Sequence, residues 1–158
     1  MTPPIPTGYH TVTPSLTFKY SQKAIEFYKK AFGANVLDVF PNLNGRGTMH
    51  ATIQIGESIL MMGDENPGQS CRSAETLGGS PINLYIYVPN VDEAFKQAVA
   101  AGGTVVMPVA DMFWGDRAGQ IKDPFGYSWM IATHTQDLTN EQIRKGAEAF
   151  FAQMGKKS

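Results

Sequence analysis

The sequence contains very little cysteine and no long apolar run. Its 158 residues include a single cysteine, Cys71, so an internal disulfide framework is excluded and a reducing compartment is favoured. The first ten residues, MTPPIPTGYH, carry neither the basic run nor the apolar core of a signal peptide. No apolar stretch approaches the roughly 18 residues that a membrane span requires. We therefore expect a cytoplasmic protein with no membrane partner.

Excess charge of either sign is also missing. Thirteen basic and fourteen acidic residues give a net charge of −1, and no stripe of Lys or Arg offers a field for nucleic acid. The chain has 42% hydrophobic and 17% charged residues, as an ordinary globular protein does. Its length predicts one domain, over residues 1–158. Nucleic acid is not an expected partner.

Several catalytic motifs are absent too. The sequence has no Gly-rich phosphate loop leading into a helix, no serine nucleophile elbow and no CxxC pair. Cys71 has no histidine beside it in sequence to lower its thiol pKa, which argues against a nucleophilic role. The familiar nucleophiles and phosphate sites therefore give no lead to function.

The sequence does contain an internal repeat. Comparison of the chain with itself at an offset of 70 residues, from Leu16 to Ile86, aligns a strand, a helix stop and a hairpin turn without a gap. The matched pairs are Leu16 with Ile86, Phe18 with Val88, Ala24 with Ala94, Gly33 with Gly103, Val36 with Val106, Gly56 with Gly126, Ser58 with Ser128 and Leu60 with Met130. This pattern predicts two copies of one supersecondary unit.

Each copy is expected to follow the order β-α-β-β-β. In the first, alternating apolar residues predict a strand before Ser21, a potential helix cap, and Gly33 is placed to end the helix. A capping box at Thr139 and Gln142 begins a last helix, whose apolar face must dock on the same subunit or on a partner. The predicted fold is α+β, with two modules forming a curved mixed sheet, or cup. The expected parts are module 1 at about 10–63, a polar linker at 64–81, module 2 at about 82–135 and the C-terminal helix at 139–154.

The most informative stretch is residues 113–131, FWGDRAGQIKDPFGYSWMI. Pro124 and Gly126 favour a tight turn, and the alternating residues on both sides of it predict a hairpin that closes the second copy. Strand alternation also predicts a polar sheet face turned away from the helices. This face is expected to contain Thr13, Ser15, Thr17, His50, Thr52, Gln54, Ser58, Leu60, Asn83, Tyr85, Tyr87, Ser128, Met130 and Ala132. Such a face suits a wet cavity for a small molecule.

These motifs resemble a known family. The segments AIEFYKKAFGA, VPNVDEAFKQAVAAGG, FWGDR and DPFGYSWMIATH, within two β-α-β-β-β units, resemble the vicinal oxygen chelate superfamily, in particular its PhnB-like, glyoxalase/bleomycin-resistance branch. The resemblance covers roughly residues 10 to 135. It implies a cup built from paired modules and a homodimer. It also implies either enzymatic chemistry, such as that of glyoxalases and dioxygenases, or non-catalytic drug sequestration.

The resemblance also locates the family's metal ligands. Carried over to this sequence, their positions fall on Thr13, about Leu60, Asn83 and Met130, none of which is a good ligand for a divalent metal. We therefore predict a small-molecule-binding protein without the family's metal site or another cofactor. The alternative is a metal-dependent isomerase, lyase or dioxygenase of the same superfamily, with a metal held at displaced positions around His50. A structural module whose cup is filled by its own side chains is a third interpretation.

Five residues are candidates for ligand binding. His50 is the only histidine predicted on a strand that faces the cavity, where it either binds ligand or makes a structural hydrogen bond. Tyr85 and Tyr87 are aromatic residues on the same predicted face. Trp114 can stack on a planar ligand or fill the cup mouth, and Arg117 can hold an anion by two hydrogen bonds or pair with a nearby acid. The expected ligand is therefore aromatic or anionic.

Other residues receive structural interpretations. Arg117 could pair with Asp116 or Asp123 instead of a ligand. His10 and His134 are expected to be ordinary surface groups. Trp129, by strand parity, is expected in the core beneath the second helix. No catalytic residue is assigned.

Overall fold

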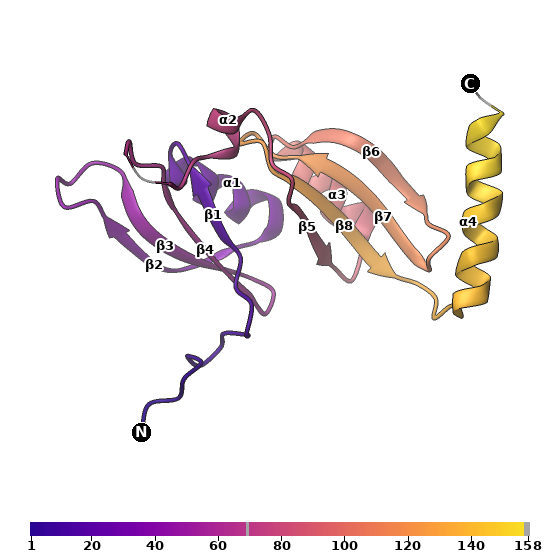
Figure 1. The fold of residues 1–158 in the computed structure, drawn as a ribbon, viewed down its shortest axis with the longest axis horizontal. Coiled ribbons are helices and arrows are strands. Elements are labelled where there is room, and N and C mark those ends of the chain that lie inside the picture. Colours follow the sequence, from indigo (N-terminus) through magenta and orange to yellow (C-terminus); the bar gives the residue numbers. More distant parts are fainter. Residues whose placement is uncertain (69, 157–158) are drawn as a thin grey trace.

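The two predicted modules are present in the structure, a computed structural model that describes residues 1–68 and 70–156. Each forms a four-stranded mixed sheet, with strand orders β1-β4-β3-β2 and β5-β8-β7-β6. The predicted α+β fold is confirmed, including the C-terminal helix (Figure 1). The first module contains β1 (Ser15–Phe18), α1 (Ser21–Phe32), β2 (Asn35–Pro41), β3 (Thr48–Ile55) and β4 (Ser58–Asp64). After α2 (Ala74–Leu77), the second contains β5 (Asn83–Tyr87), α3 (Val91–Ala100), β6 (Thr104–Asp111), β7 (Asp116–Lys122) and β8 (Ser128–His134), followed by α4 (Asn140–Gly155).

The helix ends follow local capping chemistry. Gly33 ends α1 in the left-handed conformation, with φ of 66°, as its sequence position predicts. The predicted cap at Ser21 is wrong, because this residue lies inside the helix and its N–H donates to Asp64 Oδ1 at 2.6 Å. A carboxylate from β4 thus satisfies a free amide at the start of α1, where the helix dipole also favours negative charge. The capping box that begins α4 at Thr139 is present.

The linker holds a short helix, α2, where the sequence predicted only a polar loop. Ser73 caps α2 by accepting a hydrogen bond from the Thr76 amide. Glu65 accepts from the Ser73 amide at 2.8 Å and from the Thr76 hydroxyl at 2.7 Å. These hydrogen bonds lower the pKa of Glu65 to about 2. The polar residues that suggested an unstructured loop instead form a small hydrogen-bonded cap.

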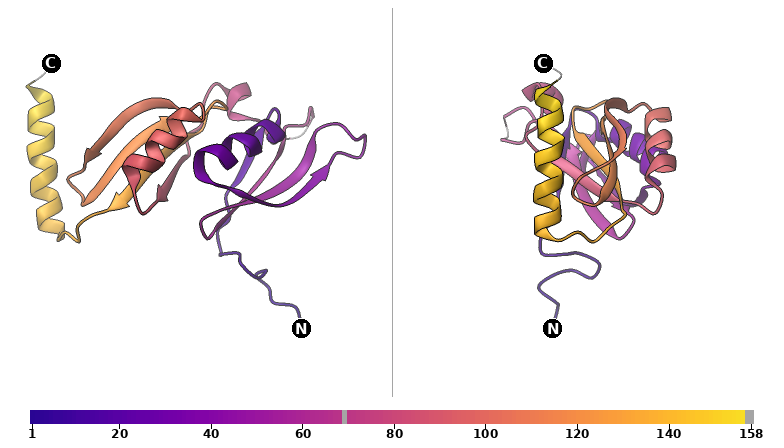
Figure 2. Two further views of the ribbon diagram at one scale, coloured as in Figure 1. Left: turned by 180° about the vertical axis from the view of Figure 1, so that it is seen from behind. Right: turned by 90° about the vertical axis from the view of Figure 1, so that its right-hand side faces the viewer.

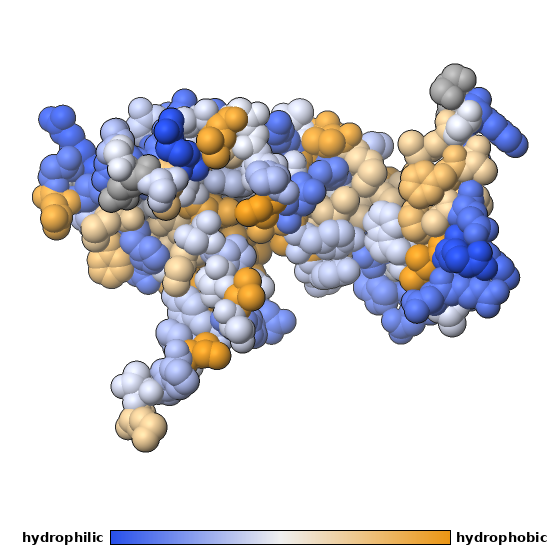
Figure 3. Space-filling view, viewed as in Figure 1, coloured by the Kyte–Doolittle hydropathy of each residue, from blue (hydrophilic) through white to orange (hydrophobic). Residues whose placement is uncertain are grey.

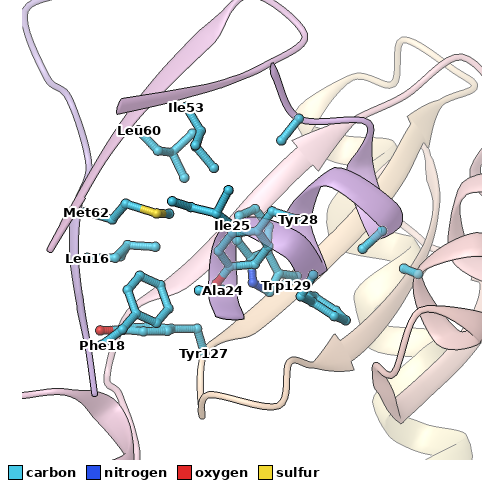
Figure 4. Close-up of a cluster of buried hydrophobic side chains, with 14 of the residues drawn as sticks. Leu16, Phe18, Ala24, Ile25, Tyr28, Ile53, Leu60, Met62, Tyr127 and Trp129 are labelled. Atoms are coloured by element: carbon cyan, nitrogen blue, oxygen red, sulfur yellow. The ribbon is translucent and has the colours of Figure 1, made fainter. Parts of the chain in front are cut away.

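The core lies between each sheet and its helix. Figure 4 shows Leu60 and Ile53 pointing toward Ile25 of α1. The expectation that Leu60 faces away from the helices is therefore wrong. Register explains the error, because Gln54 pairs with Ile59 and Thr52 with Met61, so the polar face of β3 continues through the odd-numbered residues of β4. Ser58, opposite the core-packed Ile55, was assigned to the wrong face for the same reason.

The modules are joined through their helices and through the turn after β7. Helices α1 and α3 pack on each other, and Tyr28 of α1 donates a 2.6 Å hydrogen bond to Asp123, which is buried in that turn. Trp129 donates to the same carboxylate at 2.9 Å and is fully buried, as its strand parity predicts. Seen from behind, both helices lie in front of their sheets (Figure 2). The helix-free faces, called the open faces below, therefore lie on the same side of the chain and do not enclose a space between them.

Helix α4 stands at the far end of the second module (Figure 1). Its aromatic rings meet the chain at Phe113, whose centroid lies 5.6 Å from that of Phe150 and 6.2 Å from that of Phe151. Phe151 and Met154 nevertheless stay largely exposed, at 61% and 55%. Apolar colours cover the side of α4 that faces the rest of the molecule (Figure 3). Among the described residues, no helix combines the length and apolar character needed to cross a membrane.

Candidate functional site

The predicted hairpin brings Asp116 and His134 together on the open face of the second sheet. Asp116 is the first residue of β7, His134 is the last of β8, and the two are paired in register. Tyr85 and Tyr87 lie two residues apart on β5, so both project from the same face. Because β5 pairs with β8, this strand order places both tyrosines beside the end of the hairpin.

Asp116 is the centre of a hydrogen-bonded cluster. Its Oδ2 accepts from the Tyr85 hydroxyl at 2.7 Å, the Tyr87 hydroxyl at 3.1 Å and the Trp114 indole N–H at 3.1 Å. Its Oδ1 lies 2.8 Å from Nδ1 of His134. Asp116 is only 3% exposed, so these four donors replace the water that the carboxylate would otherwise bind. We call these five residues the Asp116 cluster.

The cluster keeps Asp116 ionised and both tyrosines protonated. Burial alone would raise the pKa of Asp116, but the hydrogen bonds from His134, Tyr85, Tyr87 and Trp114 bring it below its ordinary value. Burial and the adjacent carboxylate raise the pKa of Tyr85 to about 12 and shift that of Tyr87 in the same direction. The hydroxyl protons therefore point at Asp116, and the phenol oxygens offer only lone pairs to anything else.

His134 lies between two carboxylates. Nδ1 faces Asp116 and Nε2 lies 2.8 Å from Asp137 Oδ1. A carboxylate only accepts hydrogen bonds, so both ring nitrogens carry protons when both contacts are made. The hydrogen bond to Asp116, and to a smaller extent that to Asp137, raises the pKa of His134. In this arrangement the imidazolium has no lone pair with which to act as a general base.

The loop before β7 is fixed by backbone hydrogen bonds. The Gly115 carbonyl accepts from the Thr135 and Gln136 amides at 2.9 and 3.0 Å, and from the Thr135 hydroxyl at 2.9 Å. Gly115 has φ of 98°, and a Cβ at this position would collide with the Gln136 carbonyl. A glycine is therefore required where the two loops meet. This constraint orients the neighbouring Trp114 toward Asp116.

Three of the five predicted ligand-binding residues meet in this cluster: Tyr85, Tyr87 and Trp114. His50 lies on the open face of the other module, where Nε2 is 3.1 Å from the Thr52 hydroxyl and the ring lies 6.3 Å from that of Phe40. The structure therefore does not bring His50 to the tyrosines within one chain. Its hydrogen bond corresponds to the structural interpretation of this histidine.

Arg117 lies on the opposite side of the sheet. It follows Asp116 in β7, and strand alternation turns its side chain toward α3. Its guanidinium holds Asp92 by two hydrogen bonds of 2.9 Å and Asp111 by one of 3.2 Å. The predicted alternative of pairing with an acid is thus correct, but the acids are not Asp116 or Asp123. Arg117 therefore does not join the aromatic residues at the Asp116 cluster.

Asp116 and His134 were not predicted as parts of a site. Asp116 was considered only as a partner for Arg117, and His134 only as a surface group. A usable signal was present, because the alternation that places Ser128, Met130 and Ala132 on the open face also places His134 there. Counting back across the hairpin turn then puts Asp116 opposite His134.

The residues at the family's metal positions do not fit a divalent metal. Leu60 faces the core, and Thr13, Asn83 and Met130 supply only weak or soft donors. Across residues 1–68 and 70–156, no three His, Cys, Asp or Glu side chains gather as a metal-binding group. The side chains at Thr13, Asn83 and Met130 are therefore poor donors for a divalent metal.

A cavity lies away from the Asp116 cluster. It has a volume of about 540 Å³ and is lined by the β2–β3 turn and the linker, including Asn42, Met49 and Glu65. None of the residues of the Asp116 cluster lines it. The cluster sits on an open sheet face that a single chain leaves uncovered.

Comparison with known proteins identifies the family. Residues 10–131 match the model of the Glyoxalase/Bleomycin resistance protein/Dioxygenase superfamily. The chain belongs to this superfamily. The uncharacterized protein Mb0911c of Mycobacterium bovis is a relative, 34% identical over 136 residues that cover 84% of this chain and 89% of that protein. The predicted resemblance is confirmed.

Solved structures share this glyoxalase-type fold. TioX from Micromonospora sp. ML1 has a TM-score of 0.64 and 25% identity, covering 79% of this chain and 98% of its own. A PhnB protein from Bacillus cereus has a TM-score of 0.61 and 21% identity, covering 78% and 99%. A bleomycin-binding protein in complex with bleomycin has a TM-score of 0.56 and 16% identity, covering 78% and 98%. The last two likenesses establish the fold alone.

Proposed function

We propose that this protein binds a small aromatic compound at the Asp116 cluster. The observation that carries the proposal is the convergence of Tyr85, Tyr87 and Trp114 on one buried carboxylate at an open sheet face. The rings remain accessible, with Tyr85 42% and Tyr87 64% exposed. Hydrogen bonding to Asp116 restricts these side chains before a ligand arrives, which reduces the entropy cost of binding. A planar ring system can stack on such a surface.

Two further facts support binding over catalysis. The bleomycin-binding protein holds its ligand in a structure of the same fold. At the cluster, His134 is engaged by two carboxylates and both tyrosines are held protonated, so these groups are poorly placed to remove a proton from a substrate. The alternative of a metal-dependent isomerase, lyase or dioxygenase gains no support from the donor set described above. The cytoplasmic location inferred from the sequence stays a prediction.

We further propose that a second copy of the chain covers the open face, giving a homodimer. The two open faces of one chain do not enclose a cup, so a closed site needs another surface. Edge strand β2 leaves Val36, Leu37, Val39 and Phe40 each at least 40% exposed, which is unusual for an uncovered edge. Helix α4 likewise exposes an apolar side. A partner copy would bury these surfaces and place one sheet opposite another.

NMR titration tests the binding proposal. Trp114 and Trp129 each give an indole N–H signal, and only Trp114 lies at the cluster. Bleomycin and a panel of uncharged and charged aromatic heterocycles should shift the Trp114 signal and leave that of buried Trp129 in place. Tyr87→Leu should weaken binding about tenfold, because it removes one aromatic ring on which the ligand can stack. Stacking of a planar base on an aromatic side chain contributes roughly 1–3 kcal/mol.

The matched control is Tyr20→Leu, which removes an exposed tyrosine of the first module, far from the cluster. This variant should bind as the native protein does. If no compound of the panel shifts Trp114, or if Tyr87→Leu and Tyr20→Leu weaken binding equally, the proposal fails.

A further inference from the structure

The Asp116 cluster has a charge and a ring arrangement that select among aromatic ligands. The Tyr85 and Tyr87 ring centroids lie 5.2 Å apart with planes inclined at 41°. The Trp114 indole N–H approaches the Tyr85 hydroxyl at 3.3 Å and Asp116 at 3.1 Å. Three aromatic side chains thus surround one carboxylate, on a face open to solvent.

Both tyrosine hydroxyls donate to an anion. A phenol that donates a hydrogen bond to a carboxylate gains electron density on its oxygen and ring, because donor and acceptor polarise each other. The faces of aromatic rings already carry negative potential, which attracts cations within about 6 Å of the centroid. Asp116 therefore strengthens the attraction of Tyr85 and Tyr87 for positive charge.

Positive charge of the protein is scarce at this face. Arg117 is turned to the opposite side and held by Asp92 and Asp111. Lys122 is at the other end of β7, six residues from Asp116, which corresponds to roughly 20 Å along a strand. Among the described residues, His134 is the member of the cluster that can carry positive charge, and it lies between Asp116 and Asp137. With His134 protonated, these three groups still sum to one negative charge.

The charged residues on the open face of the first module do not supply the positive charge that the Asp116 cluster lacks. Asp38 of β2 is paired with Thr52 of β3, and Phe40 of β2 with His50 of β3. Asp38 and His50 therefore project from this face. A second copy that brings this face over the Asp116 cluster would add a carboxylate and a histidine. The anionic ligand considered from the sequence depended on Arg117, and the structure removes that residue from the face.

We propose that the ligand is an organic cation, a compound with an ammonium or delocalised cationic group attached to an aromatic or apolar body. This inference rests on the proposed function and specifies its ligand class. The cationic group lies over the Tyr85, Tyr87 and Trp114 rings, with Asp116 beneath them. The apolar body extends along the open face toward Met130 and Ala118. The register of β7 and β8 places both residues on that face.

Three benzene derivatives of different charge test the inference: phenyltrimethylammonium, uncharged tert-butylbenzene, which has nearly the same shape, and anionic benzoate. We expect phenyltrimethylammonium to shift the Trp114 indole signal with at least tenfold higher affinity than the other two. Asp116→Asn, which keeps the size of the side chain and removes its charge, should reduce that preference at least fivefold. Circular dichroism establishes that the variant is folded.

A second variant, which is expected to raise the affinity, distinguishes a charge effect from a general loss of structure. His134→Gln removes the positive charge while keeping hydrogen-bonding capacity, so it should raise the affinity for phenyltrimethylammonium severalfold at pH 6. Asp111→Asn alters an exposed carboxylate on the helix side of the same module and should change nothing.

Equal affinity for the three probes, or preference for benzoate, would overturn the organic-cation inference and leave the proposed function intact. Cation preference that persists unchanged in Asp116→Asn would also overturn it. If all three probes are silent, the inference fails, and the broader aromatic panel decides the proposed function separately.

Discussion

Tyr28 of α1 donates a 2.6 Å hydrogen bond to Asp123, 95 residues later in the chain. The contact joins the first module to the turn that closes the second, and both groups are buried. Burial raises the pKa of Asp123, while Tyr28, Trp129 and two backbone amides act against that rise. This carboxylate therefore depends on its donors far more than an exposed one would.

Tyr28→Phe should lower the free energy of unfolding by about 1–3 kcal/mol, because it leaves a buried carboxylate short of one donor. Denaturant unfolding measures the change. Tyr20→Phe removes an exposed hydroxyl and should stay within about 0.5 kcal/mol of the native protein. Equal effects of the two substitutions would show that the hydrogen bond does not stabilise the module junction.

Gly115→Ala should disturb the loop that carries Trp114. The new Cβ would meet the Gln136 carbonyl, and positive φ adds a cost of about 1–2 kcal/mol for any other residue. Gly45→Ala is the control, since its φ of 71° is also positive and nothing lies within 4 Å of the Cβ. We expect a shifted Trp114 indole signal and lower stability in Gly115→Ala than in Gly45→Ala. An unmoved Trp114 signal would contradict this account of the loop.

Arg117→Gln should leave ligand binding unchanged. The guanidinium lies on the helix side of β7 with Asp92 and Asp111, and these exposed ion pairs contribute little to stability. The measurement is the affinity for the aromatic panel, compared with Tyr87→Leu. A loss of affinity in Arg117→Gln as large as that in Tyr87→Leu would return Arg117 to the binding site.

His134 should titrate above its ordinary pKa of about 6.5. Hydrogen bonds to Asp116 and Asp137 favour its charged form in the folded protein. The resulting stabilisation is complete below the pKa of the unfolded chain and is lost as pH rises through the folded pKa. NMR titration of the imidazole signals tests this, and Asp137→Asn should lower the pKa. A His134 pKa at or below 6.5 in the native protein would refute the two-carboxylate arrangement.

Phe151→Ser should weaken the proposed dimer. Phe151 is 61% exposed on α4, and a partner surface that buries it would lose apolar contact on substitution. Sedimentation velocity should show a dimer for the native chain and a shift toward monomer for the variant. Glu141→Ala alters an exposed ion pair with Lys145 in the first turn of the same helix, ten residues before Phe151, and should leave the dimer intact. A native chain that sediments as a monomer would exclude the homodimer.

The repeat could be recognised from the sequence because it rests on local signals. Alternating strands, the glycine after α1, the Thr139 cap and the turn near Pro124 each depend on residues close together in the chain. The two modules and the last helix are therefore predictable from the sequence alone. Leu60 shows where such reasoning fails, because its face depends on the register between β3 and β4 across the turn at Gly56.

The sequence by itself determined the family, the modules and the aromatic character of the open face, since strand alternation places Tyr85 and Tyr87 together. Only the tertiary structure decided which charged residue stands with them. Asp116 and Arg117 are neighbours in β7, so their side chains lie on opposite faces of the sheet. The Asp116 carboxylate is on the open face with Tyr85, and the Arg117 guanidinium is on the helix side with Asp92 of α3. The hairpin pairing can be counted along the sequence, but the hydrogen bonds from Tyr85 to Asp116 and from Arg117 to Asp92 join segments far apart in the chain, and no short stretch of sequence specifies them.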